Sequence, residues 1–393
     1  MTKQTNTPKL RFPEFKNEWS KLTMNDFLME DKQYGTQKDT NFPIVTSSRQ
    51  GLYIQNKYFE GDRSFANENV TFSIVPINYF TYRHMSDDDI FKFNINKFNT
   101  PILVSKEYPV FTVKNTFSQN FIFYELNNNM RFLKFCRIQK KGGARTRLYF
   151  KNLLKYQTYF PNYEEQQKIG AFFYLLDQQI ELEQKKLELL EQQKKGYMQK
   201  IFSQQLRFKD ENGNDYPKWE NKLLGNLVNI TMGQSPSSKN YTENSNYTTL
   251  VQGNADLNNG YIQPRIYTKQ ITKLAEVNDI LLTVRAPVGK IGRAQLKACI
   301  GRGVCAIKGD SFIYYFLELF DLQNKWIRFS QGSTFESISG NEIKNIDVAY
   351  PINEERQKIS EFLSKLDELL KNQLLKVEQL KQRKQGLLQK MFV

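Results

Sequence analysis

One long segment occurs twice in this chain of 393 residues. Residues 160–202 return as residues 350–392 at a constant offset of 190 positions, with no gap, and 18 of the 43 aligned positions are identical. Pro161 and Pro351, and Asp177 and Asp367, are among the identical pairs. Such self-similarity at a fixed offset is the sequence signature of a repeated fold, so we expect both halves to fold in the same way.

A second, shorter repeat precedes each globular stretch. The segment LRFPEFKNEW, at residues 10–19, reappears in expanded form as LRFKDENGNDYPKW at residues 206–219. The chain therefore divides into an arm (1–19), a first domain (20–159), a long helix (160–206), an arm with a second domain (207–349) and a final long helix (350–393). A pseudo-two-fold internal repeat follows from this order.

Both repeated segments have helical periodicity, with apolar residues three, four or seven positions apart. At about 1.5 Å per residue, roughly 38 residues give each helix a length of about 57 Å. We predict that the two helices pair antiparallel as a coiled coil; the alternative is that each stripe packs on its own domain. Lys194 and Lys384 interrupt the stripes at equivalent positions. The predicted packing residues are Ile169, Phe172, Leu176, Leu187, Leu190, Ile359, Phe362, Leu366, Val377 and Leu380.

The two domains have the composition of short strands and turns. In the second, segments such as NDILLTVRAPVGKIGRA alternate Val, Ile and Leu between Gly, Pro and Asn, and a short helix is expected near residues 312–320. The first domain is richer in aromatic residues and asparagine. The fold class is therefore α+β, with two α/β domains joined by the two long helices.

Net charge and composition indicate the class of binding partner, the cellular compartment and the state of the cysteines. The formal net charge of +15 and the pI near 9.4 favour a polyanionic partner, of which nucleic acid is the usual one. No run of 18 apolar residues is present and the first 20 residues are polar, so we expect a cytoplasmic protein. Cys136, Cys299 and Cys305 lie outside any CxxC pattern and are predicted to be buried thiols, with no metal site.

Catalytic motifs are missing from the sequence. It has no GxxxxGK[ST] phosphate loop, no DPPY or NPPY tetrapeptide and no FxGxG cofactor loop. The single histidine, His84, precedes Asp87, Asp88 and Asp89, which we interpret as a turn with a solvated charge run rather than a metal site. The chain is therefore predicted to be non-catalytic.

Five segments together resemble the specificity subunit of type I restriction–modification enzymes. They are LRFPEFKNEW, PNYEEQQKI, PINEERQKI, QGSTFESIS and DILLTVRAPVGKIGRA, and the resemblance extends over essentially the whole chain. It implies two target-recognition domains that each read one half of a bipartite DNA sequence, held on antiparallel helices. It also implies two methyltransferase subunits that use S-adenosylmethionine to methylate adenine, and nuclease–translocase subunits that use ATP and Mg²⁺. No cofactor is then expected on this chain. The first domain departs from the pattern because it lacks a clear counterpart of VRAPVGKIG.

Other functions remain open from the sequence. The chain could serve a methylation-only or another bipartite-site restriction system, or be a basic coiled-coil scaffold without sequence-specific DNA binding. A self-contained methyltransferase or nuclease is opposed by the missing motifs.

Residues that contact DNA are expected on loops, with Lys and Arg at phosphates and Arg, Asn, Gln, Ser or Thr at bases. The alternative for each is a solvated surface charge or a polar turn. Aromatic residues such as Tyr79, Phe80 and Tyr82 are more simply explained as core. The candidates in the first domain are Arg49, Gln50, Lys141, Gly142, Gly143, Arg145 and Arg147, and those in the second are Gln234, Ser235, Gln252, Arg285, Lys290, Arg302, Ser333 and Thr334.

Overall fold

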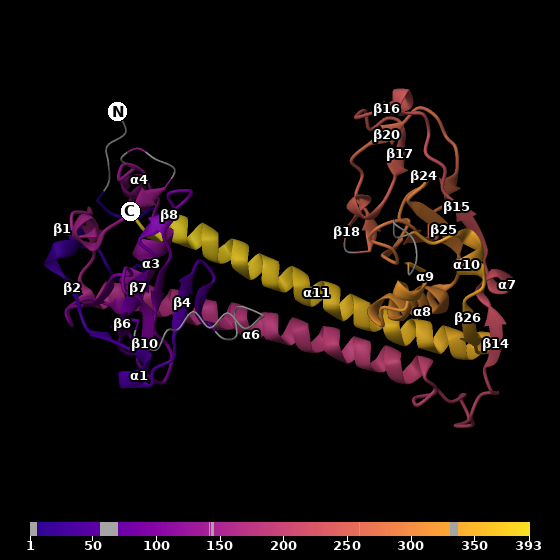
Figure 1. Ribbon diagram of the computed structural model, residues 1–393, viewed down its shortest axis with the longest axis horizontal. Helices are drawn as coiled ribbons and strands as arrows, with labels where there is room; N and C mark the ends of the chain where they lie inside the picture. Colours follow the sequence, from indigo (N-terminus) through magenta and orange to yellow (C-terminus); the bar gives the residue numbers. More distant parts are fainter. Residues whose placement is uncertain (1–5, 56–69, 141, 143–144, 259, 331–336) are drawn as a thin grey trace. The chain divides into compact units, whose positions relative to one another are not determined.

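The computed structural model describes residues 6–55, 70–140, 142, 145–258, 260–330 and 337–393. The chain forms two compact units, one of residues 1–184 with 375–393 and one of residues 185–374 (Figure 1). Each unit therefore contains one β-rich domain and part of both long helices, so the units do not coincide with the segments read from the sequence.

The first unit holds short strands in several small sheets. Strand β1 (Ser20–Thr23) pairs antiparallel with β13 (Gln157–Phe160), which closes the domain at the base of the long helix. The other sheets have the orders β10-β6-β3, β2-β11-β7-β9, β12-β8 and β4-β5. Their strands are β2 (Leu28–Glu30), β3 (Tyr34–Gly35), β4 (Val45–Ser48), β5 (Gly51–Ile54), β6 (Phe72–Val75), β7 (Phe80–Tyr82), β8 (Met85–Ser86), β9 (Phe93–Ile95), β10 (Ile102–Ser105), β11 (Val110–Val113) and β12 (Thr146–Arg147). The helices are η1 (Met24–Asp26), α1 (Gln37–Thr40), α3 (Gln119–Asn128), α4 (Met130–Arg137) and α5 (Phe150–Leu153).

Aromatic side chains make up much of the first unit's core. Phe80 and Phe111 stack with ring centroids 4.9 Å apart, and Tyr82 and Phe93 lie 4.5 Å apart. All four are fully buried, and the Tyr82 hydroxyl donates to the Leu148 carbonyl at 2.9 Å. Phe80 and Tyr82 therefore belong to the core and are not available to stack on bases.

The second unit is built on two larger sheets, of order β15-β25-β22-β23-β19-β18 and β16-β20-β17-β24-β21, and the pair β14-β26. Helix α8 (Ser311–Leu322) confirms the short helix predicted near residues 312–320. The strands are β14 (Glu220–Leu223), β15 (Asn229–Met232), β16 (Tyr241–Thr242), β17 (Thr248–Val251), β18 (Leu257–Asn258), β19 (Tyr261–Ile262), β20 (Tyr267–Thr268), β21 (Leu274–Ala275), β22 (Ile280–Thr283), β23 (Ile291–Arg293), β24 (Ala298–Ile300), β25 (Val304–Lys308) and β26 (Asp347–Tyr350). The other helices are α7 (Leu224–Leu227), η2 (Ser238–Asn240), η3 (Asn254–Asp256), α9 (Ile327–Ser330) and α10 (Gly340–Lys344).

The two repeated segments are long helices, as predicted. Helix α6 (Tyr163–Phe202) has 40 residues and α11 (Asn353–Met391) has 39. Each begins just after its proline with two glutamates in the first turn and has a lysine in the last turn. Acidic residues at the helix N-terminus and basic residues at the C-terminus are stabilised by the helix dipole, which helps to fix both boundaries.

Within each unit the two long helices run antiparallel. In the first unit Asp177 of α6 binds Lys384 of α11, and Glu183 binds Lys376 at 2.5 Å. As the residue number rises on one helix it falls on the other, which defines the antiparallel direction. In the second unit Lys194 binds Asp367 at 2.6 Å. The two interrupting lysines of the stripes are thus ion-paired across the helix pair at equivalent positions.

A three-residue contact is repeated at these lysines. A tyrosine of the domain donates its hydroxyl to the aspartate at 2.7 Å in both units, and the lysine lies over the tyrosine ring. Desolvation raises the tyrosine pKa in each case. Each contact therefore ties both helices to one domain. Its members are Tyr124, Asp177 and Lys384 in the first unit, and Tyr315, Asp367 and Lys194 in the second.

The arms are held by a second repeated contact. Arg11 donates Nε to the Glu165 carboxylate at 2.6 Å, and Arg207 donates Nη2 to Glu355 at 2.6 Å. Both glutamates are buried, with 1% and 0% of their surface exposed. Trp219 Nε1 also donates to Glu355, at 2.8 Å. In each half, a buried ion pair thus joins the arm to the first turn of the long helix.

The predicted packing stripe is partly shifted. Ile169 and Ile359 are buried in the cores of the first and second unit respectively, but Phe173 and Leu363 are fully buried where the sequence indicated Phe172 and Phe362. Those two phenylalanines are half-buried and contact the arms, because their rings lie 5.9 Å from Phe12 and 5.7 Å from Phe208.

The remaining stripe residues differ in environment. Leu176 packs in the first core and Val377 is buried, while Leu187 and Leu190 are half-buried. Leu366 and Leu380 pack on the edges of the two cores. The stripe therefore packs against the domains near the helix ends as well as against the partner helix, and the two alternatives read from the sequence both describe part of it.

Two further expectations concern the cysteines and the apolar character of the helices. All three cysteines are free and buried, and burial raises the pKa of the Cys136 and Cys305 thiols to about 12. Among the described helices, none combines the length and apolar character that a membrane crossing requires.

A buried carboxylate of α3 makes the first unit sensitive to pH. Glu125 is 1% exposed and accepts hydrogen bonds from Asn129 Nδ2 at 2.9 Å and from the Tyr156 hydroxyl at 3.1 Å. Burial raises its pKa from 4.5 to about 7. Since the folded state holds this proton more tightly than the unfolded state, the first unit should lose stability as pH rises from about 4.5 to about 7.

Glu125→Gln is therefore expected to stabilise the first unit at pH 8 by about 2–3 kcal/mol and to have little effect at pH 4.5. Hydrogen exchange of first-unit amides across this pH range measures the difference. Glu107→Gln, at an exposed position, is the matched control and should change stability little at either pH. A pH-independent effect of Glu125→Gln would contradict the interpretation.

Candidate nucleic-acid interface

The three candidate arginines of the first domain lie around the β4–β5 turn and strand β8. Arg49 and Gln50 form the turn between β4 and β5, and β12, which carries Arg147, pairs with β8. Arg145 immediately precedes β12. The structure thus brings together residues almost 100 positions apart in the sequence.

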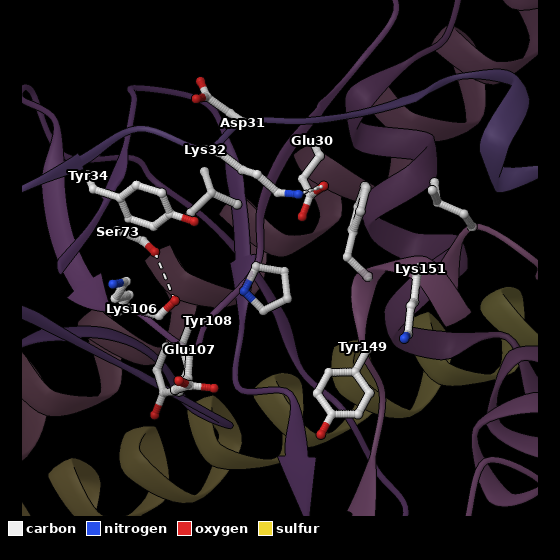
Figure 2. A pocket seen from close by; sticks show the side chains of 14 residues that line it. Glu30, Asp31, Lys32, Tyr34, Ser73, Lys106, Glu107, Tyr108, Tyr149 and Lys151 are labelled. Carbon is white, nitrogen blue, oxygen red and sulfur yellow. Dashed lines mark hydrogen bonds and ion pairs between the residues drawn. The ribbon is translucent and has the colours of Figure 1, made fainter. Parts of the chain in front are cut away.

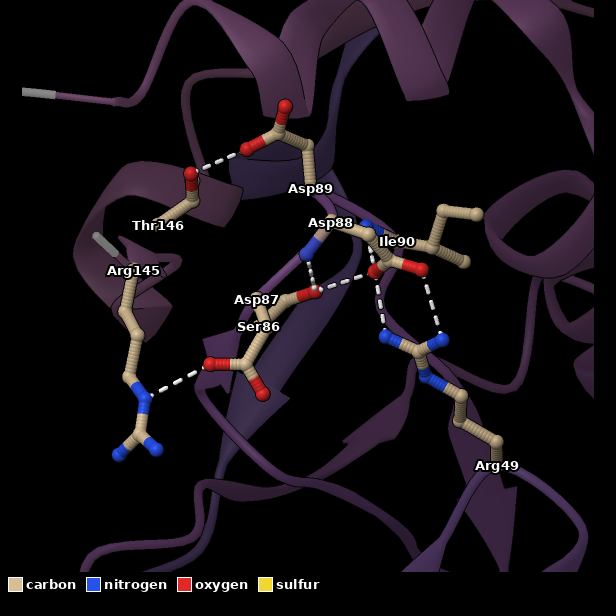
Figure 3. A network of polar contacts seen from close by, with 8 residues as sticks. All are labelled: Arg49, Ser86, Asp87, Asp88, Asp89, Ile90, Arg145 and Thr146. Carbon is tan, nitrogen blue, oxygen red and sulfur yellow. Dashed lines mark hydrogen bonds and ion pairs between the residues drawn. The ribbon is translucent and has the colours of Figure 1, made fainter.

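Each aspartate of the run after β8 has a partner (Figure 3). The Arg49 Nη1 donates to Asp88 at 2.7 Å and its Nη2 donates to the other oxygen of the same carboxylate. The Arg145 Nε donates to Asp87 at 2.7 Å, and the Thr146 hydroxyl donates to Asp89. Hydrogen bonds from Arg49 lower the pKa of Asp88 to about 2.

The run is a bend in which 64% of the Asp87 side chain and 45% of the Asp88 side chain are exposed, as the interpretation of a solvated turn expected, but its carboxylates also bind partners that the sequence did not indicate. His84 is 4% exposed and stacks on Tyr149 with centroids 5.4 Å apart, and burial lowers its pKa. The aspartates fix the β4–β5 turn and the start of β12, partners that are distant in the sequence. Within the described part of the chain, no group of three or more His, Cys, Asp or Glu side chains is arranged to hold a metal ion.

A groove of about 580 Å³ opens beside this cluster, and it includes two cationic residues that sequence reasoning missed. Arg83 and Lys92 line it together with Arg49 and Gln50. Arg83 is exposed between the buried Tyr82 and His84. That alternation is the signal which could have identified it as an outward-facing residue.

The second groove of the first unit, of about 340 Å³, has balanced charge (Figure 2). Its lining includes three lysines and three acidic residues, and Lys32 binds Glu30 at 2.8 Å. The Ser73 hydroxyl donates to the Lys106 carbonyl at 3.3 Å across its wall. A groove with this balance does not favour a polyanion.

Helix α4 begins a strongly basic stretch. Residues 126–163 contain nine Lys and Arg and no Asp or Glu, whereas the equivalent residues 316–353 contain three Lys and Arg and five Asp and Glu. Lys134, Arg137 and Lys140 are exposed along or just beyond α4, and among the described residues none of the three has an ion-pair partner. We call these three residues the α4 basic ridge. Unpaired cations on one face are the expected footprint of a phosphate backbone.

In the second domain the structure brings four candidates together. The Ser235 hydroxyl accepts from the Arg302 backbone N–H at 3.1 Å, and the Gln234 N–H donates to Ile300 at 2.9 Å. A Cβ built at Gly303 would lie 2.1 Å from the Gln252 carbonyl oxygen, so only glycine allows these two loops to approach. Arg302 is exposed at the tip of this arrangement.

The loop that carries Gln252 is organised by a residue that the sequence did not single out. Asp256 is 4% exposed and accepts from the Gln252 N–H at 2.7 Å and from the Gly253 N–H at 3.2 Å. Arg265 donates two nitrogens to the same carboxylate, at 2.9 and 2.7 Å. Asp256 thus has a positioning role, and the acidic residue four positions after Gln252 was the available signal.

Arg285 and Lys290 lie on the connection between β22 and β23 and differ in their contacts. The Lys290 ammonium binds Asp321 of α8 at 2.9 Å, so it is engaged within the domain. Arg285 is exposed and its backbone bridges to Ser337. Gly289 has φ of +93°, and a Cβ there would lie 2.0 Å from the Trp326 ring. The loop is therefore fixed against α8 and Trp326 while Arg285 remains accessible.

The remaining candidates are less defined. Gly142 has φ of +69° and is exposed, with open space where a Cβ would stand. Gln50 and Arg147 are exposed. Lys141, Gly143, Ser333 and Thr334 lie outside the described residues.

Comparison with known proteins decides the family. Residues 21–192 and 216–379 each match the model of the type I restriction modification DNA specificity domain, so both halves are covered. The chain belongs to this family. The two specificity domains correspond to the two halves of the internal repeat.

Individual relatives agree with this placement. The chain is 29% identical over 288 residues to the "putative type I restriction enzyme MjaX specificity subunit" of Methanocaldococcus jannaschii, which covers 70% of this chain and 67% of that protein. It is 25% identical over 194 residues to the type I restriction enzyme MjaIX specificity subunit of the same organism, over 43% of that protein's length.

Two solved structures share the fold. One is the type I restriction-modification S subunit from M. genitalium, with a TM-score of 0.61 and 17% identity over 98% of this chain and 99% of that one. The other comes from work on complex assembly and conformational transition of the type I R-M system, with a TM-score of 0.59 and 20% identity over 95% of this chain and 97% of that one. At these identities the likeness concerns the fold of the specificity chain.

Proposed function

We propose that this chain is the subunit that selects DNA sequence for a type I restriction–modification complex, with each domain reading one half of a bipartite target. The observation that carries the proposal is a frame of two contacts that is repeated in both units, combined with sequences that differ between the two domains. The Arg–Glu contact of the arm and the Tyr–Asp–Lys contact of the helices recur in both units. The two domains differ in sequence where this frame is preserved, for example with Arg145 and Arg147 against Phe335 and Ser337 at the 190-residue offset.

Joining two readers through helices increases both affinity and selectivity. Once one domain is bound, the second binds as an intramolecular event, which can raise the overall affinity by about 10²–10⁴ over either domain alone. A target with the wrong spacing loses that gain, since each extra base pair moves a half-site by about 3.4 Å and turns it by roughly 34–36°. The net charge of +15 supplies attraction to phosphates that does not depend on sequence.

The chemistry belongs to partners in this proposal. Two methyltransferase subunits would carry S-adenosylmethionine and methylate adenine, and nuclease–translocase subunits would use ATP and Mg²⁺. This chain would carry no cofactor and direct both activities by placing them on the target. The family name supports the specificity role, and the partner subunits follow from it by analogy.

The test is genome-wide detection of methylated adenine by single-molecule sequencing, in cells that supply the methyltransferase subunit with or without this chain. A bipartite motif present only with the chain is expected, and gives both half-sites and their spacing. If an active methyltransferase assembles with the chain and no motif appears, the proposal is wrong and the scaffold alternative takes its place.

The α4 basic ridge should control affinity rather than sequence preference. Replacing Lys134, Arg137 and Lys140 by glutamine in the assembled methyltransferase complex is expected to reduce the slope of log K against log salt by about 0.9 for each phosphate that the protein no longer neutralises. The ratio of cognate to scrambled affinity should stay within about two-fold, because phosphate contacts carry no base information.

The control variant removes three positive charges, as the ridge variant does, but at lysines that are already ion-paired with a carboxylate. Lys32, Lys222 and Lys297 bind Glu30, Glu220 and Glu276 at 2.7–2.8 Å. Their replacement by glutamine should change the salt slope much less than the ridge variant. An equal change in both triple variants would mean that only net charge matters and that the ridge makes no local contact.

A further inference from the structure

The two arginines that bind the aspartate run present different nitrogens to it. Arg49 uses both terminal nitrogens, Nη1 and Nη2, to bind the two oxygens of Asp88. Arg145 uses only Nε to bind Asp87, and Figure 3 shows its two terminal nitrogens directed away from that carboxylate. The donor pair is therefore occupied on Arg49 and free on Arg145, among the residues that the structure describes.

This difference decides which arginine can read a base. A guanidinium recognises guanine by donating two hydrogen bonds from neighbouring nitrogens to O6 and N7 in the major groove. Asp88 already accepts that donor pair from Arg49, and its own position is fixed by the Ser86 hydroxyl at 2.9 Å and the Ile90 N–H at 3.2 Å. Arg49 thus holds the β4–β5 turn against the loop after β8.

Among the described residues, the contacts of Arg145, unlike those of Arg49, leave its two terminal nitrogens free to bind a base. Asp87 binds the inner nitrogen and so fixes the direction of the side chain, while 53% of that side chain remains exposed. The backbone beneath it is anchored, because Thr146 pairs with Ser86 in the β12–β8 ladder and its hydroxyl donates to Asp89. A guanidinium oriented in advance loses less entropy when it binds.

We propose that Arg145 reads a guanine in the half-site of the first domain, that Asp87 is its positioning residue, and that Arg49 is structural. This deepens the proposed function, on which it rests, by naming one base pair and one residue of the reading surface. The aspartate run acts here as a template that orders two arginines for two different purposes.

The experiment measures the methylation motif of the assembled methyltransferase complex with each variant. Arg145→Ala is expected to lower discrimination at one G·C pair of one half-site by about 10- to 100-fold, with all other positions unchanged. Asp87→Asn should weaken the preference at that same pair by a smaller factor, and Asp87→Glu should partly restore it. Arg49→Lys should leave the motif unchanged, and Arg302→Ala in the second domain should leave this half-site unchanged.

Several results would overturn the inference. A uniform loss across all positions with Arg145→Ala would identify a phosphate contact, and a half-site without any G·C pair would exclude the reading of a guanine. A change of base preference with Arg49→Lys would reverse the two roles. If the alanine variant does not assemble, Arg145→Lys and Asp87→Asn decide, because both keep the size and polarity of the site. Absence of any motif with the unmodified chain would instead reject the proposed function itself.

Discussion

Removing residues 185–188 from α6 is expected to lower methylation of the native target by on the order of 100-fold. Four residues correspond to about 6 Å of helix and a rotation of about 40° beyond one full turn. The contacts Asp177–Lys384 and Lys194–Asp367 are 17 residues apart on both helices. Shortening one helix alone prevents both contacts from forming in register, and under the proposed function this changes the half-site spacing that the complex accepts.

The measurement is methylation of a set of targets that differ only in the length between the half-sites. The control keeps the length of α6 and replaces the exposed Lys185, Lys186 and Glu188 by alanine, which should leave the native target preferred. Unchanged preference for the native spacing after the deletion would show that the helix pair does not set the distance.

Arg207→Met should destabilise the second unit by about 3 kcal/mol or more, because it leaves the carboxylate of Glu355 buried without its ion-pair partner. Glu355 is 0% exposed and the hydrogen bond to it raises the pKa of Arg207. The remaining donor from Trp219 does not neutralise the charge. Arg11→Met should act in the same way on the first unit through Glu165.

Urea unfolding followed by hydrogen exchange in each unit separates the two effects. Lys222→Met is the matched control, since it breaks an exposed ion pair with Glu220 and should change stability by no more than about 0.5 kcal/mol. Equal destabilisation by Arg207→Met and Lys222→Met would show that burial of Glu355 has no energetic consequence.

The two long helices could be predicted well from the sequence because the residues that mark their starts are close together in the chain and occur twice. Proline, acidic first turns and a constant offset define where α6 and α11 begin, and the equivalent lysines indicated a special position in each stripe. What the stripe could not show was which of two adjacent apolar residues faces inward. Phe172 and Phe362 were chosen, yet the arm residues Phe12 and Phe208 occupy that face, and this depends on tertiary contacts.

The candidate interface was predicted less completely, for a related reason. Arg49 and Asp88 are 39 positions apart, and Arg145 and Asp87 are 58 apart, so no local pattern reveals that they are paired. In the second domain Gly301 and Gly303 flank Arg302, but the close approach of the Gly303 and Gln252 loops became evident only in the structure. Residue type alone marked these arginines as candidates for DNA contact, and only the structure shows that Arg49 binds a carboxylate with both terminal nitrogens while Arg145 uses Nε.

The way in which the helix ends complete the two cores has a consequence for synthesis of the chain. Phe392 stacks on Phe121 with centroids 5.1 Å apart, and Met391 and Leu388 belong to the same core. In the second unit the equivalent Phe202 lies 5.1 Å from Phe312, and it is translated before the domain that it supports. The second core takes its last residues from the first turns of α11, such as Ile359 and Leu363, whereas the first core includes Met391, which is translated 270 positions after Phe121. The first domain is thus translated first, yet the last residue that its core requires is translated after the last residue of the second core.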